Sequence, residues 1–245
     1  MVALDATPVA PVIAQSGGGD LWRLFAQSFD VFTIVLLIGS MSAVGVIVRC
    51  AIDIRRAAIF PDEPASRAST LVEQGRWGEL REFVRTQGGY LGSVLGVALR
   101  EAHLGRSVMD DAAELAASRE TASWFRRAEP LSLIGNMGPL VGLAGTVWGM
   151  ILAFTSLGET GGQAGPTELS EGISKALFHT LLGLVLAVPC LLAFGYFRSK
   201  IDAICTDAIA RTAQMVGRIP AGDDCPDALR PKPASSKSNA PKGKG

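Results

Sequence analysis

The chain contains three long apolar stretches without a charged side chain, at residues 31–48, 130–158 and 176–197. A run of about 18 apolar residues is long enough to cross a bilayer as a helix, so we predict three transmembrane helices. Apolar positions continue at helical spacing from Ile201 to Met215. The third helix is therefore expected to run well beyond the membrane, to about residue 216.

Between the first two stretches, shorter helices are predicted. Apolar residues recur there at intervals of three or four, and glycines at positions 75, 78, 88, 89 and 105 mark the breaks. Both ends of the chain are rich in small, polar and proline residues, which cannot bury enough apolar surface to become ordered. The predicted fold class is all-α, with three transmembrane helices and long cytoplasmic helical extensions. The predicted divisions are a flexible external arm (1–20), a first transmembrane helix with a cytoplasmic extension (21–60), a cytoplasmic helical domain (61–130), a second transmembrane helix (131–157), an external loop (158–166), a third transmembrane helix with a cytoplasmic extension (167–217) and a disordered cytoplasmic tail (218–245).

The distribution of basic residues predicts the orientation of these helices. Of the 23 lysines and arginines, 12 lie in Arg49–Arg127 and 9 in Arg198–Gly245, whereas the N-terminal arm holds Arg23 and the second connection holds Lys175. Positive side chains are retained on the cytoplasmic side of a membrane. The N-terminus is therefore predicted to lie outside, and the middle segment and the C-terminus inside.

Two threonines lie deep in the second and third apolar stretches. Measured from Arg127 and Arg198, which mark the cytoplasmic ends, Thr146 and Thr180 lie about 28 Å and about 27 Å along their helices at about 1.5 Å per residue. Two hydroxyls at the same depth in hydrocarbon favour a polar path between helices. The alternative, for each threonine taken singly, is a hydrogen bond to a carbonyl one turn earlier in its own helix.

Small residues form a stripe along each of these two helices. The second helix carries Gly135, Gly138, Gly142, Gly145 and Gly149, at spacings of 3, 4, 3 and 4. The third carries Ala176, Thr180, Gly183, Ala187 and Cys190, at spacings of 4, 3, 4 and 3. Such stripes allow close backbone packing in lipid, either between the subunits of an oligomer or between the two helices of one chain. Pro139 and Pro189 are assigned as kink sites, because each frees a backbone carbonyl inside its helix.

The sequence lacks the patterns typical of an enzyme, a metal site or a nucleotide site. His103 and His179 stand apart from any nucleophile with a base, and no cluster has metal-ligand spacing. The basic residues are dispersed and interleaved with acids, which argues against binding to nucleic acid. We expect neither enzymatic activity nor a cofactor.

The segments NMGPLVGLAGTVWGMILAF at residues 136–154 and GISKALFHTLLGLVLAVP at residues 172–189 carry a resemblance. They resemble the MotA/TolQ/ExbB proton-channel family, most closely its ExbB and TolQ branch. The resemblance implies a multi-pass protein of the bacterial inner membrane that forms a pentamer around a central pore. It also implies that the pore holds single transmembrane helices of an ExbD- or TolR-like partner, whose membrane aspartate works with pore-lining Thr146 and Thr180.

The function implied by the resemblance is that of a proton-channel motor subunit. With its single-span partner, such a subunit couples the proton motive force to energised transport or maintenance at the outer envelope. A TonB-like energy transducer and the lipid bilayer are the further partners that it implies. The alternative is an oligomeric membrane scaffold that binds the single-span partner and conducts weakly or not at all.

One position departs from the ExbB and TolQ pattern. Those proteins have a glutamate five residues before the threonine of the third span, in a pattern like IAEAL, and this chain has Lys175 in the run ISKAL. We expect Glu171, one turn earlier, to pair with Lys175 in the favourable order. Glu171, Lys175 and His179 are then the candidate outer entrance. The alternative is that Lys175 extends to the outer interface and lines nothing.

Overall fold

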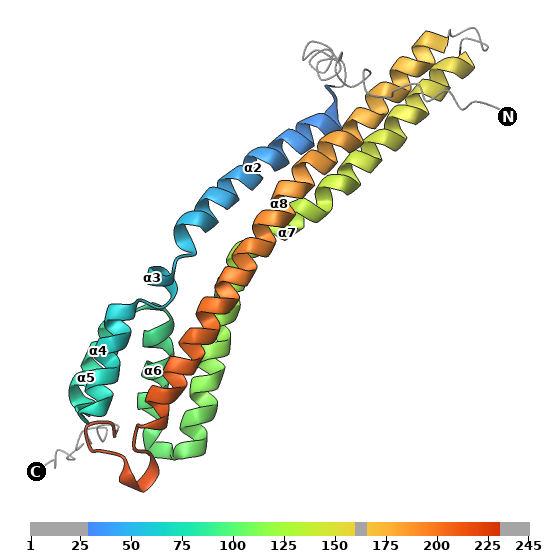
Figure 1. The fold of residues 1–245 in the computed structure, drawn as a ribbon. Coiled ribbons are helices and arrows are strands. Elements are labelled where there is room, and N and C mark those ends of the chain that lie inside the picture. Colours follow the sequence, from blue (N-terminus) through green and yellow to red (C-terminus); the bar gives the residue numbers. More distant parts are fainter. Residues whose placement is uncertain (1–28, 160–165, 231–245) are drawn as a thin grey trace, which may run out of the picture. The chain divides into compact units, whose positions relative to one another are not determined.

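The computed structural model describes residues 29–159 and 166–230, with the backbone alone for residues 166–168. Within these ranges every regular element is a helix (Figure 1). The predicted arm at 1–20 and most of the predicted loop at 158–166 lie outside them. The chain divides into two compact units, which we call the apolar unit (Met1–Ile52 and Arg127–Arg198) and the helical unit (Asp53–Arg126 and Ser199–Gly245).

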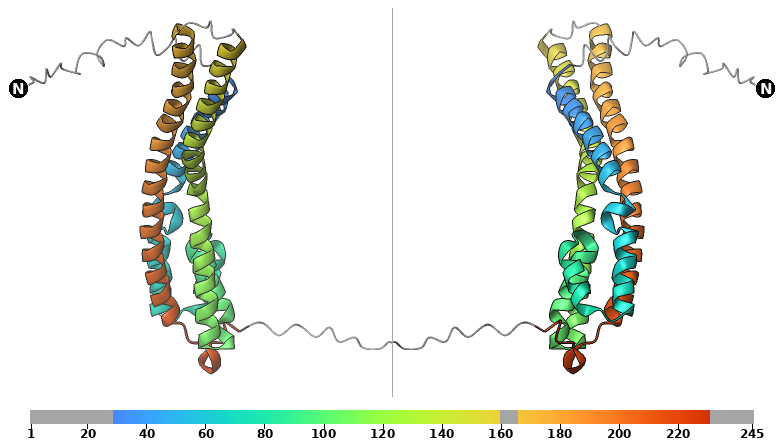
Figure 2. Two further views of the ribbon diagram at one scale, coloured as in Figure 1. Left: turned by 90° about the vertical axis from the view of Figure 1, so that its right-hand side faces the viewer. Right: turned by 90° about the vertical axis from the view of Figure 1, so that its left-hand side faces the viewer.

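The apolar unit contains three helices that are long and apolar enough to cross a membrane. They are α2 (Val31–Asp53) and parts of α7 (Arg106–Glu159) and α8 (Pro166–Gly217). Figure 2 shows α2 alongside α7 and α8, and a small cluster of Leu36, Ala43, Leu186 and Cys190 joins α2 to α8. Large apolar side chains such as Ile38, Leu140 and Val185 are exposed, as expected for a lipid-facing surface. The protein is therefore an all-α, multi-pass membrane protein.

Helices α7 and α8 are both longer than their apolar stretches. α7 continues without a break through Pro130 and Pro139, so the boundary predicted at residues 130 and 131 does not interrupt the helix. α8 runs through Pro189, over nearly the same residues as the helix predicted at 167–217. A proline inside a helix removes one backbone hydrogen bond. Membrane helices tolerate this loss where neighbouring groups satisfy the freed carbonyl, and the predicted kinks stay a prediction.

The helical unit is built from short helices packed on parts of α7 and α8. These are α3 (Arg56–Ile59), α4 (Asp62–Glu73), α5 (Trp77–Thr86), α6 (Gly89–Glu101), and the 3₁₀ turns η1 (Ala102–Leu104) and η2 (Gly222–Asp224). Gly75 separates α4 from α5 with a backbone φ of +65°, a conformation that glycine adopts readily. The core of the helical unit includes Tyr90, Leu95 and Met109, all of them fully buried.

One predicted boundary is corrected by the structure. In the division predicted at 21–60, the helix itself ends at Asp53, and the chain then turns to bury Ile59 and Phe60. The predicted disordered tail at 218–245 begins too early. Ile219 and Leu229 are 1% exposed and pack into the core of the helical unit, so residues 218–230 are ordered by apolar side chains that the polar composition concealed.

Candidate functional site

Thr146 on α7 and Thr180 on α8 meet in the apolar unit. Their hydroxyls are hydrogen-bonded to each other, which agrees with the equal depths expected from the sequence. Thr146 Oγ1 also donates to the carbonyl oxygen of Gly142 at 3.0 Å, or to that of Ala176 on α8 at 3.2 Å. Each hydroxyl has one proton to donate and lone pairs to accept, so the two can change partners by rotation. Thr146 therefore makes the hydrogen bond to its own helix that a single threonine can make, and also a hydrogen bond to Thr180 on the other helix.

The small-residue stripes bring these hydroxyls together. A Cβ atom on Gly142 would lie 2.7 Å from the carbonyl oxygen of His179, and one on Gly183 would lie 2.5 Å from that of Gly138. Gly135 and Gly149 have equally close neighbours on α8, Leu191 and Ala176 respectively. The two stripes therefore pack against each other within one chain. This is the contact within one chain that the sequence left open, and packing between subunits stays a prediction.

Glu171 and Lys175 form an ion pair on α8, with 2.8 Å between Oε1 and Nζ. The pair expected from the (i, i+4) spacing is therefore present. Its side chains remain partly accessible, at 49% and 34% exposed, and a pair of this kind contributes little to stability. Its role as an outer entrance stays a prediction.

His179, one turn beyond Lys175, is 2% exposed. It contacts a residue that is not among the site residues predicted from the sequence. Its Nε2 atom lies 3.0 Å from Oδ1 of Asp30, which immediately precedes α2. The sequence offers one signal for Asp30: it lies directly before an apolar run, where a helix-capping residue is expected. That signal indicates the start of a helix and gives no hint of a partner 149 residues away.

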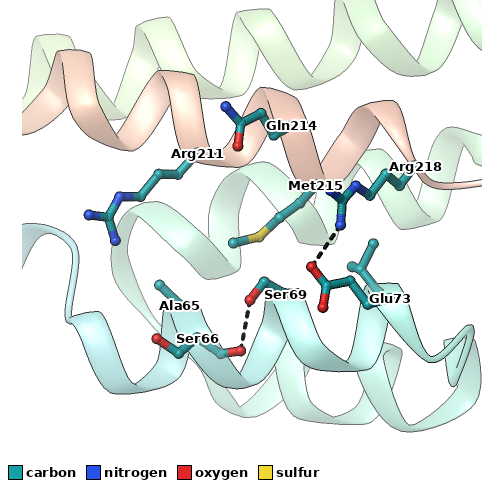
Figure 3. Close-up of a pocket in the computed structure, with 9 residues that line it drawn as sticks. Ala65, Ser66, Ser69, Glu73, Arg211, Gln214, Met215 and Arg218 are labelled. Atoms are coloured by element: carbon teal, nitrogen blue, oxygen red, sulfur yellow. Dashed lines mark hydrogen bonds and ion pairs between the residues drawn. The ribbon is translucent and has the colours of Figure 1, made fainter.

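A polar groove between α4 and α8 belongs to the helical unit (Figure 3). Figure 3 shows Arg218 directed towards Glu73, and these side chains are 2.7 Å apart. Arg211, also on the groove, pairs with Asp207 at 3.2 Å and with Asp62 at 3.3 Å. Since acids neutralise both arginines, the groove is best explained as a polar contact between two helices. Among the residues that the structure describes, no group of three or more His, Cys, Asp or Glu side chains could hold a metal ion.

Comparison with known proteins agrees with the resemblance noted in the sequence. The sequence model of the MotA/TolQ/ExbB proton channel family matches residues 89–208, which include the whole contact between α7 and α8 around the threonine pair. The biopolymer transport protein exbB1 of Vibrio cholerae is 36% identical over 96 residues, which are 38% of this chain and 42% of that protein. The Tol-Pal system protein TolQ of Haemophilus influenzae is 36% identical over 93 residues, 38% of this chain and 40% of that protein.

A third relative is similar to the same degree. The biopolymer transport protein ExbB of Xanthomonas campestris is 35% identical over 95 residues, 39% of this chain and 37% of that protein. The chain thus spans about two fifths of the length of the curated relatives that it matches.

Proposed function

This chain belongs to the MotA/TolQ/ExbB proton channel family, in its ExbB and TolQ branch, and on that premise we propose that it is a proton-channel motor subunit. Several copies, five in the assembly that the family resemblance implies, surround a pore that admits the helix of an ExbD- or TolR-like partner. Protons move through this pore down their gradient. The subunit thereby couples the proton motive force to energised transport or maintenance at the outer envelope, with a TonB-like transducer as a further partner.

The observation that carries this proposal is the hydroxyl pair of Thr146 and Thr180. The pair lies in a stretch of α7 without Asp, Glu, Lys or Arg from Pro130 to Gly158, and in a stretch of α8 without them from Ala176 to Phe197. Polar groups inside a membrane segment are expensive and mark pathways for ions. Hydroxyls can pass hydrogen bonds along a path but do not titrate near neutral pH, so a partner's carboxylate supplies the charge-changing group.

The proposed placement is in the bacterial inner membrane, with the N-terminus outside and the C-terminus in the cytoplasm. It rests on the basic residues, which gather in Arg49–Arg127 and Arg198–Gly245. In this orientation the helical unit is cytoplasmic. The exposed apolar side chains of α2, α7 and α8 provide the surface for lipid and for neighbouring subunits.

A non-conducting or weakly conducting scaffold is the second candidate, and Lys175 is the observation that favours it. An ammonium group replaces the carboxylate of the ExbB and TolQ pattern, and a positive charge at the mouth of a cation pathway repels protons. The ion pair with Glu171 offsets that charge. On balance the pair leaves the entrance nearly neutral, which supports conduction.

Co-reconstitution distinguishes the two candidates. The chain is purified together with a single-span partner that carries a membrane aspartate, and the complex is placed in liposomes with a pH-sensitive dye inside. The motor subunit is expected to form a complex with the partner and to carry protons when a membrane potential is imposed. A stable complex without proton uptake would support the scaffold, and the absence of any complex would contradict both candidates.

A further inference from the structure

Asp30 and His179 bring two ionisable side chains together at the end of the apolar unit where α2 begins. His179 Nε2 and Asp30 Oδ1 are 3.0 Å apart, and the histidine is 2% exposed. Along α8 this contact lies between the ion pair of Glu171 with Lys175 and the hydroxyl pair at Thr180. The order of polar groups is therefore an ion pair, a carboxylate with an imidazole, and then two hydroxyls.

The carboxylate of Asp30 is held in place by the first turn of α2. Its Oδ1 atom accepts hydrogen bonds from the backbone N–H groups of Phe32 and Thr33, both at 3.1 Å. The carbonyl oxygen of Asp30 accepts the first bond of the helix, from the N–H of Ile34 at 3.0 Å. Asp30 is thus the N-cap of α2, a position where the helix dipole favours a negative charge.

The contact with Asp30 determines where His179 can take up a proton. A carboxylate accepts hydrogen bonds, so the hydrogen of a neutral imidazole resides on Nε2, which donates to Asp30. The other ring nitrogen, Nδ1, then carries a lone pair. In the described part of the chain Nδ1 is buried and has no hydrogen-bond partner. A basic nitrogen is therefore left ready for a proton, with a carboxylate on the far side of the ring.

The packing around the ring fixes its position. The ring of Phe32 lies edge-on to it, with 6.3 Å between the centroids. A Cβ atom on Gly145 would lie 2.9 Å from Cγ of His179, so α7 presses directly on the ring. The imidazole has little freedom to move away from Asp30.

Among the residues that the structure describes, few other charges face this pair. α2 has no ionisable side chain between Val31 and Val48, and its cap is Asp30 itself. α7 has none between Pro130 and Gly158. On α8 itself, Lys175 is one turn away and is paired with Glu171. Asp30 is thus the charged group that contacts the imidazole directly.

We propose that Asp30 and His179 form a proton-binding site on the outer side of the threonine pair. The proton comes from external water and adds to the lone pair of Nδ1, which gives an imidazolium with a hydrogen on each nitrogen. Asp30 remains a carboxylate and balances the charge, and the same N–H bond breaks when the proton leaves. The place of this site in a conducting path rests on the proposed function, whereas its ability to bind a proton does not.

The first test identifies which ring nitrogen of His179 takes up a proton. The full-length chain, reconstituted with its single-span partner, carries ¹⁵N-labelled histidine and the change His103→Asn, so that His179 is the single imidazole of this chain. Asp30→Asn keeps a good N-cap and a hydrogen-bond acceptor but removes the charge. In the unmodified complex and in Glu171→Gln, the matched control, the ¹⁵N shifts are expected to place the hydrogen of the neutral ring on Nε2 and the added proton on Nδ1. Asp30→Asn is expected to weaken the preference of the neutral ring for a hydrogen on Nε2. A neutral ring that carries its hydrogen on Nδ1 in the unmodified complex would overturn the proposal.

The second test measures proton uptake by the same complexes. His179→Gln and Asp30→Asn are each expected to reduce uptake at least about tenfold, in keeping with the loss of a positioned proton acceptor, while the complex still assembles. Normal uptake in both variants would remove the site from the path. If the unmodified complex takes up no protons at all, the proposed function fails, and the ¹⁵N spectra still decide whether Nδ1 of His179 binds a proton.

Discussion

Gly142 offers a direct test of how the threonine pair is held together. The substitution Gly142→Ala adds one methyl group to α7, 2.7 Å from the carbonyl oxygen of His179 and 3.0 Å from Cα of Thr180. Ordinary contacts begin at 3.4 Å, so α7 and α8 must separate by about 0.7 Å at this point. Both neighbouring atoms belong to the backbone of α8 and cannot rotate away. The helix pair therefore has to move as a whole.

The expected loss of stability combines two opposing effects. Overpacking of a close contact costs about 1–3 kcal/mol. Replacing glycine by alanine inside a helix returns about 0.5–1 kcal/mol. The net loss for Gly142→Ala is thus about 1 kcal/mol from the mid-values, within a range of about 0–2.5 kcal/mol. Gly195 provides the control, because a Cβ atom there has no neighbour within 4 Å, and Gly195→Ala is expected to gain about 0.5–1 kcal/mol.

Unfolding in mixed micelles measures both variants on one scale. The purified full-length chain is titrated with a denaturing detergent, and loss of helix is followed by circular dichroism at a fixed protein concentration. Gly142→Ala is expected to unfold at a lower detergent fraction than the unmodified chain, and Gly195→Ala at the same fraction or a higher one. If Gly142→Ala proves as stable as Gly195→Ala, the stripes do not determine the distance between α7 and α8.

The helical unit supports two further predictions. Leu95 is completely buried there, so Leu95→Ala is expected to cost about 2–5 kcal/mol of folding stability. Leu115→Ala, at a half-exposed position of α7, is the control and should change stability by about 0.5 kcal/mol or less. Chemical denaturation compares the two variants, and equal losses of stability would contradict the assigned core. Burial raises the pKa of Tyr90 from 10.0 to about 12, so the stability that its neutral form contributes is complete below pH 10 and is lost as the pH rises towards 12. In a Tyr196→Phe background, absorbance should show folded Tyr90 still protonated near pH 11, and ionisation near pH 10 would refute the assigned burial.

The sequence was sufficient to predict the membrane helices and the polar groups inside them. An apolar run has one stable form in lipid, a helix, and helical rise alone then places Thr146 and Thr180 at one level. The Glu171 and Lys175 pair follows from the same geometry, since residues four apart are neighbours on a helix. Each of these features is local, or depends on two helices that both cross the membrane.

Features that depend on packing could not be predicted in this way. Asp30 meets His179 only because α2 lies against α8, and the sequence gives no register between those helices. The continuity of α7 through Pro130 depends on its surroundings, because proline permits either a break or a continuous helix. Composition alone assigns residues 218–230 to the tail. Ile219 and Leu229 order them because a core lies within reach, which no window of sequence reveals.

Proton uptake by the variant Thr146→Val with Thr180→Val tests the central claim most directly. Valine keeps nearly the same shape and removes both hydroxyls, and each lost hydrogen bond on the path costs about 1–3 kcal/mol, so uptake by the assembled complex should fall at least about tenfold. The control is Thr155→Val, since that hydroxyl bonds to the carbonyl of Ile151 in its own helix and should be dispensable. Uptake at the unmodified rate in the double variant, with the complex intact, would contradict the account.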